Sequence, residues 1–515
     1  MSDPTIPQGA KKAVAAPVVH TDRGAVRGLT RKDGSSAYLG IPFAAPPVGD
    51  RRFAAPAVHP LWEDVLPANR YGATPQRSPL LPVTTIPEPS IPGMSTLNVN
   101  VFTPAPCDTQ AKLPVFVWIH GGGYVAGSPA SPWYDGRAFN RDGVITVTLS
   151  YRLGFDGFGW VEGTNAPLNR GLLDQIAALE WVQKNIAAFG GDPSRVTIGG
   201  QSAGGGSVQT LLVSPRAYGL FRGAISHSAA TGGMDIASAQ KHAHDFAQLL
   251  GVSPNLEGWR SVSEESIAAQ ERELNSFESF SGLSAEPDVT EMIEILRSGN
   301  SDSVPGVVWS PVIDVDIVPV AVRTAIETGG AATHIPLLVG GTRNEFAFPT
   351  PVLQEHITAG LSAAGISDAA VQSWADEIEV INETYSFSQL YSSLTMRSAT
   401  PAVGAARLLA GAGERTWLFD FAGRSSIDSL SSHCFELPFA WDLLGAPGVQ
   451  SVLGPQPDQN LADTVHRDWV RFISDGTVSW RPIAESNHGA RVYASEGVND
   501  HADPYLFERA LLNTD

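Results

Sequence analysis

Residues 195–213 read RVTIGGQSAGGGSVQTLLV, and this stretch decides the fold. Its centre, GQSAG at residues 200–204, fits the pattern G-x-S-x-G between a β-branched run and an apolar segment typical of a helix. A sharp strand-to-helix turn would hold Ser202 in a strained backbone conformation at a helix N-terminus, where partial positive charge favours a developing anion. The alternative is a glycine-rich turn with an idle serine.

A second informative stretch, LPVFVWIHGGGY at residues 113–124, joins a continuous apolar run to three glycines. Such a run is typical of a strand buried on both faces of a parallel sheet. Consecutive glycines let backbone N–H groups converge on one point, which a tetrahedral oxyanion requires. We expect the amides of Gly122, Gly123 and Ala203 to be the donors and His120 to be structural. A flexible glycine loop is the alternative.

The rest of the chain alternates strand and helix patterns. Residues 171–189 have helical spacing, and further strands are predicted at residues 144–151, 223–226, 334–341 and 415–423. Residues 18–29 predict a hairpin, and residues 40–53 and 75–94 form Pro-rich loops. This alternation predicts an α/β fold with a mostly parallel sheet between helices.

The predicted domain organisation is simple. Residues 1–17 are expected to form a loose tail, and residues 18–515 a single domain. Two helical, less patterned segments, residues 235–305 and 350–410, are expected to be lid-like insertions that cover a site.

An acid and a base are expected downstream of the serine, in that order. Asp314, Asp316 and Glu345 all follow predicted strands. Asp314 and Asp316 lie in a segment typical of a turn. Glu345 stands just beyond the apolar run at residues 334–341, at the carboxyl edge where sites of α/β sheets lie.

The candidate bases are the histidines that follow Glu345: His356, His433, His466, His488 and His501. His466 lies in an amphipathic helical pattern, His356 in an insertion, and the last two in polar loops. His433 follows the predicted strand 415–423 by one loop, so its imidazole could reach the sheet edge. Position therefore favours His433.

Composition excludes several classes of function. The chain has 515 residues, 43% hydrophobic content and a formal net charge of −19, and no basic stripe for nucleic acid is present. No apolar run reaches the roughly 18 residues of a membrane span, and no secretory signal opens the chain, so we expect a cytoplasmic protein. Cys107 and Cys434 are expected to be reduced thiols. No metal motif appears, and no cofactor is expected.

Several longer stretches together resemble the type-B carboxylesterase family of α/β-hydrolases, which also contains the cholinesterases. The bacterial enzymes similar to p-nitrobenzyl esterases are the nearest in character. The stretches run almost end to end, at residues 40–53, 97–104, 115–128, 150–158, 169–205, 341–346 and 433–441. The resemblance implies the α/β-hydrolase fold and a catalytic triad of Ser202, His433 and Glu345. It also implies an oxyanion hole from the three amides named above.

Some positions depart from the family pattern. The family usually has Glu before the nucleophile, and here Gln201 stands there, so we expect a lower pKa for His433 than Glu would give. Glu436 is expected to supply a nearby charge in its place, and Ser228 resembles a supporting serine of the family. The loop at residues 75–94 has no tryptophan, which disfavours choline esters. Tyr124, Phe346 and Phe348 are expected to line the substrate pocket.

The implied function is hydrolysis of a small to medium carboxylic ester, aryl or hydrophobic, through an acyl-serine. The partners are then the ester and water. Hydrolysis of a carbamate or amide on the same scaffold is an alternative, because the same groups would serve those bonds. A non-catalytic binding protein on the same fold is a more distant alternative. Binding proteins of this family typically lose the serine or the histidine, and this chain has candidates for both.

Overall fold

The computed structural model describes residues 15–75, 85–163, 166–229, 233–274, 287–298, 309–314, 316–329 and 331–513. Of the predicted tail, residues 1–14 lie outside these ranges. The prediction is wrong for residues 15–17, because they begin the first strand and pair with the second.

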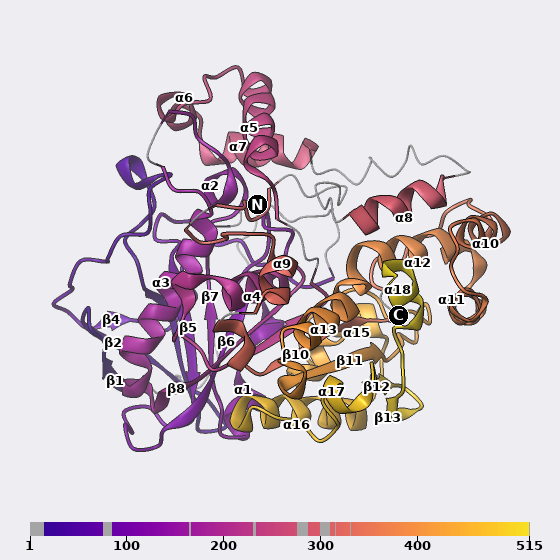
Figure 1. The fold of residues 1–515 in the computed structure, drawn as a ribbon. Helices are drawn as coiled ribbons and strands as arrows, with labels where there is room; N and C mark the ends of the chain where they lie inside the picture. Colours follow the sequence, from indigo (N-terminus) through magenta and orange to yellow (C-terminus); the bar gives the residue numbers. More distant parts are fainter. Residues whose placement is uncertain are drawn as a thin grey trace, which may run out of the picture.

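One sheet runs through the described part of the chain (Figure 1). In spatial order its strands are β1 (Ala15–His20), β2 (Ala25–Thr30), β3 (Ser36–Pro42), β5 (Asn98–Thr103), β7 (Ile145–Leu149), β6 (Leu113–Ile119), β8 (Gly191–Gln201), β9 (Gly223–His227), β10 (Leu337–Thr342), β11 (Thr416–Ala422), β12 (Ala490–Ala494) and β13 (Gly497–His501), while β4 (Leu66–Pro67) pairs with β2. All neighbours from β7 to β12 are parallel, and the outer strands are antiparallel. The mostly parallel sheet and the hairpin at residues 18–29 are therefore confirmed.

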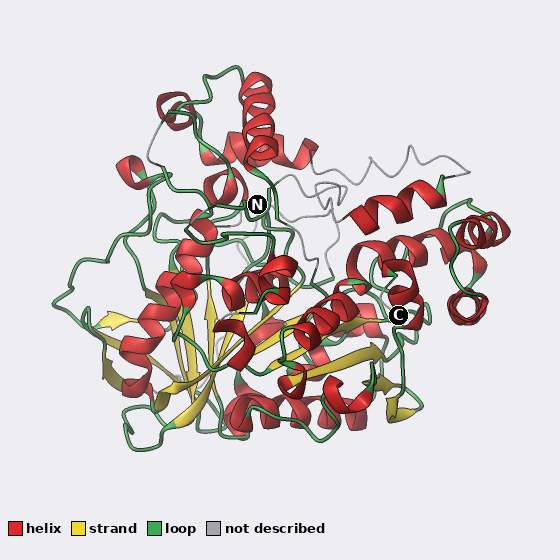
Figure 2. Cartoon of the chain, in the orientation of Figure 1, coloured by secondary structure: helices red, strands yellow, loops and turns green. Residues whose placement is uncertain are grey.

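Helices cover both faces of the sheet because successive side chains of a buried strand point to opposite sides (Figure 2). In β6, Val115 and Val117 pack into the cluster that contains α3 (Arg170–Asn185) and α4 (Ala203–Val213). Phe116 and Trp118 instead join the cluster of α16 (Gln459–Asp475). Shorter helices complete the layers: α1 (Arg137–Arg141), α2 (Gly154–Phe158), α9 (Val322–Glu327), α14 (Leu437–Ala440), α15 (Val449–Leu453) and α17 (Ile483–Ser486).

Both predicted insertions are helical where the structure describes them. The first holds α5 (Ile236–Leu250), α6 (Leu256–Ser261), α7 (Glu264–Leu274) and α8 (Val289–Ser298), and the second holds α10 (Gln354–Ala363), α11 (Asp368–Ile381), α12 (Ser386–Ser392) and α13 (Ala399–Leu409). Helices α8, α10, α11 and α12 share a separate hydrophobic cluster with α18 (Leu506–Leu512). Figure 1 shows α5 to α7 and the group of α8, α10 and α11 as two separate projections from the sheet.

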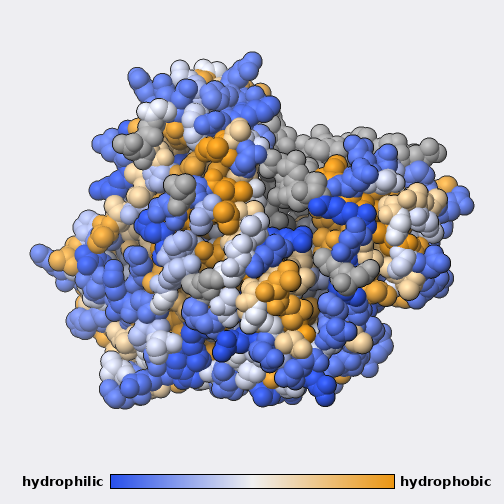
Figure 3. Space-filling view, in the orientation of Figure 1, coloured by the Kyte–Doolittle hydropathy of each residue, from blue (hydrophilic) through white to orange (hydrophobic). Residues whose placement is uncertain are grey.

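The surface of the described residues is largely hydrophilic on the face that Figure 3 draws, and hydrophobic residues gather there in small patches. None of the described helices combines the length and hydropathy that a membrane-spanning segment requires.

Candidate active site

Ser202 occupies a sharp turn between β8, which ends at Gln201, and α4, which begins at Ala203. Its φ of 58° and ψ of −125° are a strained conformation for a residue with a side chain. The Ser202 amide donates to the carbonyl of His227 at 2.9 Å, which ties the turn to β9. A Cβ atom at Gly204 would lie 2.1 Å from the carbonyl oxygen of Ile119, so the helix can approach the sheet only with glycine there. The predicted strand, turn and helix are all present.

The glycine loop after β6 lies directly against this turn. A Cβ atom at Gly121 would come within 3.0 Å of the Ser202 Cβ, so loop and serine are in contact. Gly122 and Gly123 have φ values of 112° and 60°, which favour glycine. Within the described residues, neither of their amides donates to an acceptor. The Ala203 amide is the first of α4, where a helix leaves its N–H groups without intrahelical acceptors.

His433 and Glu345 form a close pair although 88 positions separate them in the chain. Glu345 Oε2 lies 2.5 Å from His433 Nδ1, and the other carboxylate oxygen accepts the Thr342 amide at 3.0 Å. The backbones are also joined, because the His433 amide donates to the Glu345 carbonyl at 2.9 Å. The Glu345 side chain is fully buried and the His433 side chain is 13% exposed, so the carboxylate fixes the ring and its tautomer.

The other ring nitrogen of His433 faces Gln201. The Nε2 atoms of the two residues lie 2.9 Å apart, and Phe346 packs on the ring at a tilt of 32°, with centroids 4.4 Å apart. Burial lowers the pKa of His433, but the neighbouring Cys434 sulfur and the Glu345 carboxylate raise it by more, so it lies well above its ordinary value. In the described part of the chain, Ser202 Oγ makes no hydrogen bond to this nitrogen.

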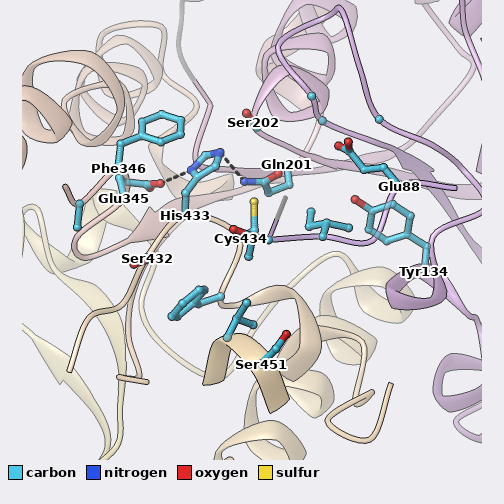
Figure 4. Close-up of a pocket in the computed structure, with 18 of the residues that line it drawn as sticks. Glu88, Tyr134, Gln201, Ser202, Glu345, Phe346, Ser432, His433, Cys434 and Ser451 are labelled. Atoms are coloured by element: carbon cyan, nitrogen blue, oxygen red, sulfur yellow. Dashed lines mark hydrogen bonds and ion pairs between the residues drawn. The ribbon is translucent and has the colours of Figure 1, made fainter. Parts of the chain in front are cut away.

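These groups line one cavity of about 400 Å³ (Figure 4). Figure 4 shows the Glu345, His433 and Gln201 side chains in one row, with Ser202 beside it. Its apolar wall includes Ile86, Phe346, Ala347, Phe435 and Val452. A cavity of this size and lining fits a small or medium organic molecule.

Two predicted pocket residues are not among the described residues that line this cavity. Tyr124 has a φ of 63° and packs its ring on Phe158, with centroids 4.9 Å apart. Phe348 packs instead near Tyr391. Of the three predicted aromatics, Phe346 lines the cavity.

The predicted supporting residues also lie close by. Glu436 is fully buried, but its recorded partner is His227 Nδ1 at 3.2 Å rather than His433. Glu436 was expected to supply a charge beside His433, but the described residues show no hydrogen bond or ion pair between the two. Ser228 has a φ of 44°, and a Cβ atom at Gly341 would lie 2.5 Å from Glu345 Oε1 and 3.1 Å from Ser228 Oγ. Ser228 thus lies near the carboxylate.

The alternative acids and bases occupy other places. Asp314 accepts the amides of residues 316–318 within its own turn, and Asp316 pairs with Arg216 on the surface. His466 bonds the Ala440 carbonyl and Asp142. His120 is buried against Tyr151, and burial lowers its pKa to about 4, as suits a structural histidine.

Cys434, His227 and Glu88 are among the residues of the site that were not predicted from the sequence. Cys434 lines the cavity beside His433 with a φ of 76° and is a free thiol, as is Cys107. His227 bonds Glu436 and Trp469 beneath the turn, and Glu88 reaches the cavity from the Pro-rich loop. Of these three, His227 could have been found from the sequence, because it directly follows the predicted strand at residues 223–226, where side chains reach the edge of the sheet.

The described residues hold no group of three or more His, Cys, Asp or Glu side chains placed to bind a metal ion. The chemistry that the site offers comes from the serine turn, the paired imidazole and carboxylate, and the backbone amides.

Comparison with known proteins agrees with this geometry. The model of the carboxylesterase family matches residues 15–491. The para-nitrobenzyl esterase of Bacillus subtilis is 35% identical over 96% of this chain and 98% of its own length, and mouse carboxylesterase 1D is 30% identical over 89% and 85%.

Solved structures show the same similarity. A PNB esterase structure superposes with a TM-score of 0.72 at 31% identity, covering 96% of this chain and 99% of the other. A carboxylesterase of Geobacillus stearothermophilus gives 0.75 at 28% identity over the same shares. The chain therefore belongs to the carboxylesterase family of α/β-hydrolases and is a serine hydrolase of carboxylic esters.

Proposed function

We propose that Ser202, His433 and Glu345 form the catalytic triad of this ester hydrolase. The observation that carries the proposal is the 2.5 Å contact between His433 Nδ1 and Glu345 Oε2 in a cavity that Ser202 also lines. The strained turn at Ser202 is the backbone conformation that this kind of nucleophile requires.

In the first half-reaction, Ser202 Oγ attacks the ester carbonyl while His433 Nε2 takes its proton. This nitrogen contacts Gln201 in the resting structure, so the Ser202 hydroxyl must replace the Gln201 amide as its partner. Glu345 stabilises the resulting imidazolium. The tetrahedral oxygen accepts from the amides of Gly122, Gly123 and Ala203, which supports its negative charge.

Collapse of this tetrahedral intermediate breaks the bond to the alcohol, which takes the proton from His433 and leaves, and this completes the first half-reaction. In the second half, water attacks the acyl-serine while His433 takes its proton; the bond to Ser202 Oγ then breaks, His433 returns the proton to that oxygen, and the carboxylic acid leaves. Besides groups of the chain, these steps use only the ester and one water molecule.

The substrate that the cavity favours is a small to medium ester with an aryl or hydrophobic group. Its volume of about 400 Å³ and the apolar wall named above support this choice. A series of p-nitrophenyl esters tests it: kcat/KM should rise with acyl length and fall once the chain exceeds the cavity. A preference for short charged acyl groups would contradict it.

We also propose that residues 15–515 work as one domain in the cytoplasm of a bacterium. The sheet that runs through the described residues supports one domain, and the two free thiols suit a reducing compartment. The acidic charge supports the absence of nucleic acid among its partners.

The triad is tested by replacing its members and labelling the nucleophile. Ser202→Ala should lower kcat by about 10⁶-fold with the melting temperature little changed. A fluorinated organophosphate should label one serine per chain, and peptide mass spectrometry should identify residue 202. Activity retained in Ser202→Ala, or a label elsewhere, would refute the assignment.

A further inference from the structure

A buried carboxyl from the first insertion contacts the scaffold next to the glycine loop. Helix α7 lies against α2 (Figure 1), and Glu271 on α7 is 7% exposed. Its Oε1 accepts the Phe155 amide at 2.6 Å, and a Cβ atom at Gly154 would lie 2.5 Å from both carboxyl oxygens. Helix α2 has no side-chain cap from Leu153, its own N-cap residue. Glu271 therefore caps α2 from a different part of the chain.

Helix α2 in turn supports the glycine loop. The Gly154 amide, one residue before the amide that Glu271 binds, donates to the Tyr124 carbonyl at 2.7 Å. Tyr124 directly follows Gly123, has a left-handed backbone, and packs its ring on Phe158 at the other end of α2. The position of this loop thus depends on α2 at two points.

The arginines near Glu271 bind other acceptors of α2. Arg52 holds Asp156 of α2 through two bonds of 2.9 and 3.0 Å, and Arg170 donates to the Phe155 and Asp156 carbonyls. On α7 itself, Glu264 and Glu265 also act on Arg52. An ionised Glu271 would therefore face the carboxylate of Asp156 across α2.

These surroundings favour the protonated carboxyl. The pKa of Glu271 is raised to about 8, mainly by burial and to a smaller extent by the Asp156 carboxylate. The Phe155 N–H lowers this pKa, and Trp309 and Arg52 lower it more weakly. Glu271 is therefore mostly neutral at pH 7 and ionises in the mildly alkaline range.

We propose that Glu271 is a positioning residue for ester hydrolysis: by capping α2 it holds Tyr124, and with it the amides of Gly122 and Gly123, where the oxyanion forms. The inference rests on the oxyanion hole of the proposed function. On ionisation, repulsion by Asp156 and the cost of burial drive the carboxylate away from α2, so the Phe155 amide loses its acceptor. Because the oxyanion exists only in the transition state, kcat falls more than KM rises.

The test compares kcat and KM for p-nitrophenyl butyrate between pH 6 and 10. In the unaltered enzyme, kcat should fall as pH rises through about 8. Glu271→Gln keeps an oxygen acceptor and cannot ionise, so it should retain kcat at pH 7 and lose the alkaline fall. Glu271→Ala should lower kcat roughly ten- to a hundredfold at every pH with a smaller change in KM. The control Glu257→Gln, an exposed change on the neighbouring helix α6, should behave as the unaltered enzyme.

Two results would overturn the inference. One is an alkaline fall that persists unchanged in Glu271→Gln. The other is a Glu271→Ala enzyme with normal kcat in its folded fraction. If the alanine variant does not fold, the pH profile of Glu271→Gln still decides. Measuring Ser202→Ala in parallel separates the two claims. Activity in Ser202→Ala refutes the triad. If Ser202→Ala is inactive and the Glu271 variants have normal kcat at every pH, only the positioning role is refuted.

Discussion

Replacing Gln201 by Glu should raise the pKa of His433 and move the acidic limb of the pH–rate profile upward. Gln201 Nε2 lies 2.9 Å from His433 Nε2, so the new carboxylate would stand beside the imidazolium. Two opposite charges about 4 Å apart attract by about 4 kcal/mol at an effective dielectric constant near 20. At 1.36 kcal/mol per pKa unit this corresponds to about 3 units.

The full shift will not be reached, because Gln201 is only 1% exposed and burying the new carboxylate opposes it. We therefore expect the pKa of His433 to rise by about 1 to 2 units. His433 must be unprotonated to accept the Ser202 proton, so kcat/KM of Gln201→Glu should be lower than that of the unaltered enzyme at acidic pH and recover only at higher pH.

The assay is kcat/KM for p-nitrophenyl butyrate against pH, in the unaltered enzyme and in Gln201→Glu. Gln201→Met should move the acidic limb less, because it removes the amide without adding charge. Gln248→Glu, an exposed change on α5, should leave the limb in place. An acidic limb that does not move in Gln201→Glu, or moves to lower pH, would refute the reasoning.

Three further changes follow from the structure. Glu345→Gln should lower kcat by about 10⁴-fold because a neutral amide no longer fixes the His433 tautomer, and a loss below tenfold in kcat for an aryl ester would argue against it. Asp420→Asn should cost roughly 3–5 kcal/mol at pH 7, because it removes the buried carboxylate that Arg343 and Arg397 share and leaves Arg397 with Glu508 alone. Burial opposes ionisation of Asp420, but the two arginines hold its pKa below the ordinary value. The stability that the ionised carboxylate contributes is therefore present above about pH 4 and is lost as pH falls further. Urea titrations should show a smaller difference in free energy of unfolding between the unaltered enzyme and Asp420→Asn at pH 3 than at pH 7. Gly204→Ala should lower the melting temperature sharply because its Cβ would meet the Ile119 carbonyl at 2.1 Å, whereas Gly445→Ala, with nothing within 4 Å, should not; equal melting temperatures would contradict the packing argument.

The sequence predicted best what is local. The β-branched run before Ser202 and the glycines around it specify strand, turn and helix within a dozen residues, and all three are present. The strands at residues 113–119 and 416–422 followed in the same way from continuous apolar runs.

What the sequence could not show depends on contacts between distant segments. Gln201 and His433 are 232 positions apart, and their contact depends on how β8 and the loop after β11 meet. Glu436 was expected near His433, but the packing of β9 places His227 against it. Tyr124 was expected in the pocket, but its ring packs on Phe158 of α2 instead. No periodic pattern encodes these directions.

The most direct test is the structure of the enzyme after reaction with a phosphonate that carries a small alkyl group. We predict a bond from phosphorus to Ser202 Oγ, with the phosphonyl oxygen about 2.7–3.1 Å from the amides of Gly122, Gly123 and Ala203. We also expect His433 Nε2 to be turned from Gln201 toward the Ser202 oxygen. A phosphonyl oxygen directed away from the glycine loop, or an adduct on any other residue, would contradict it.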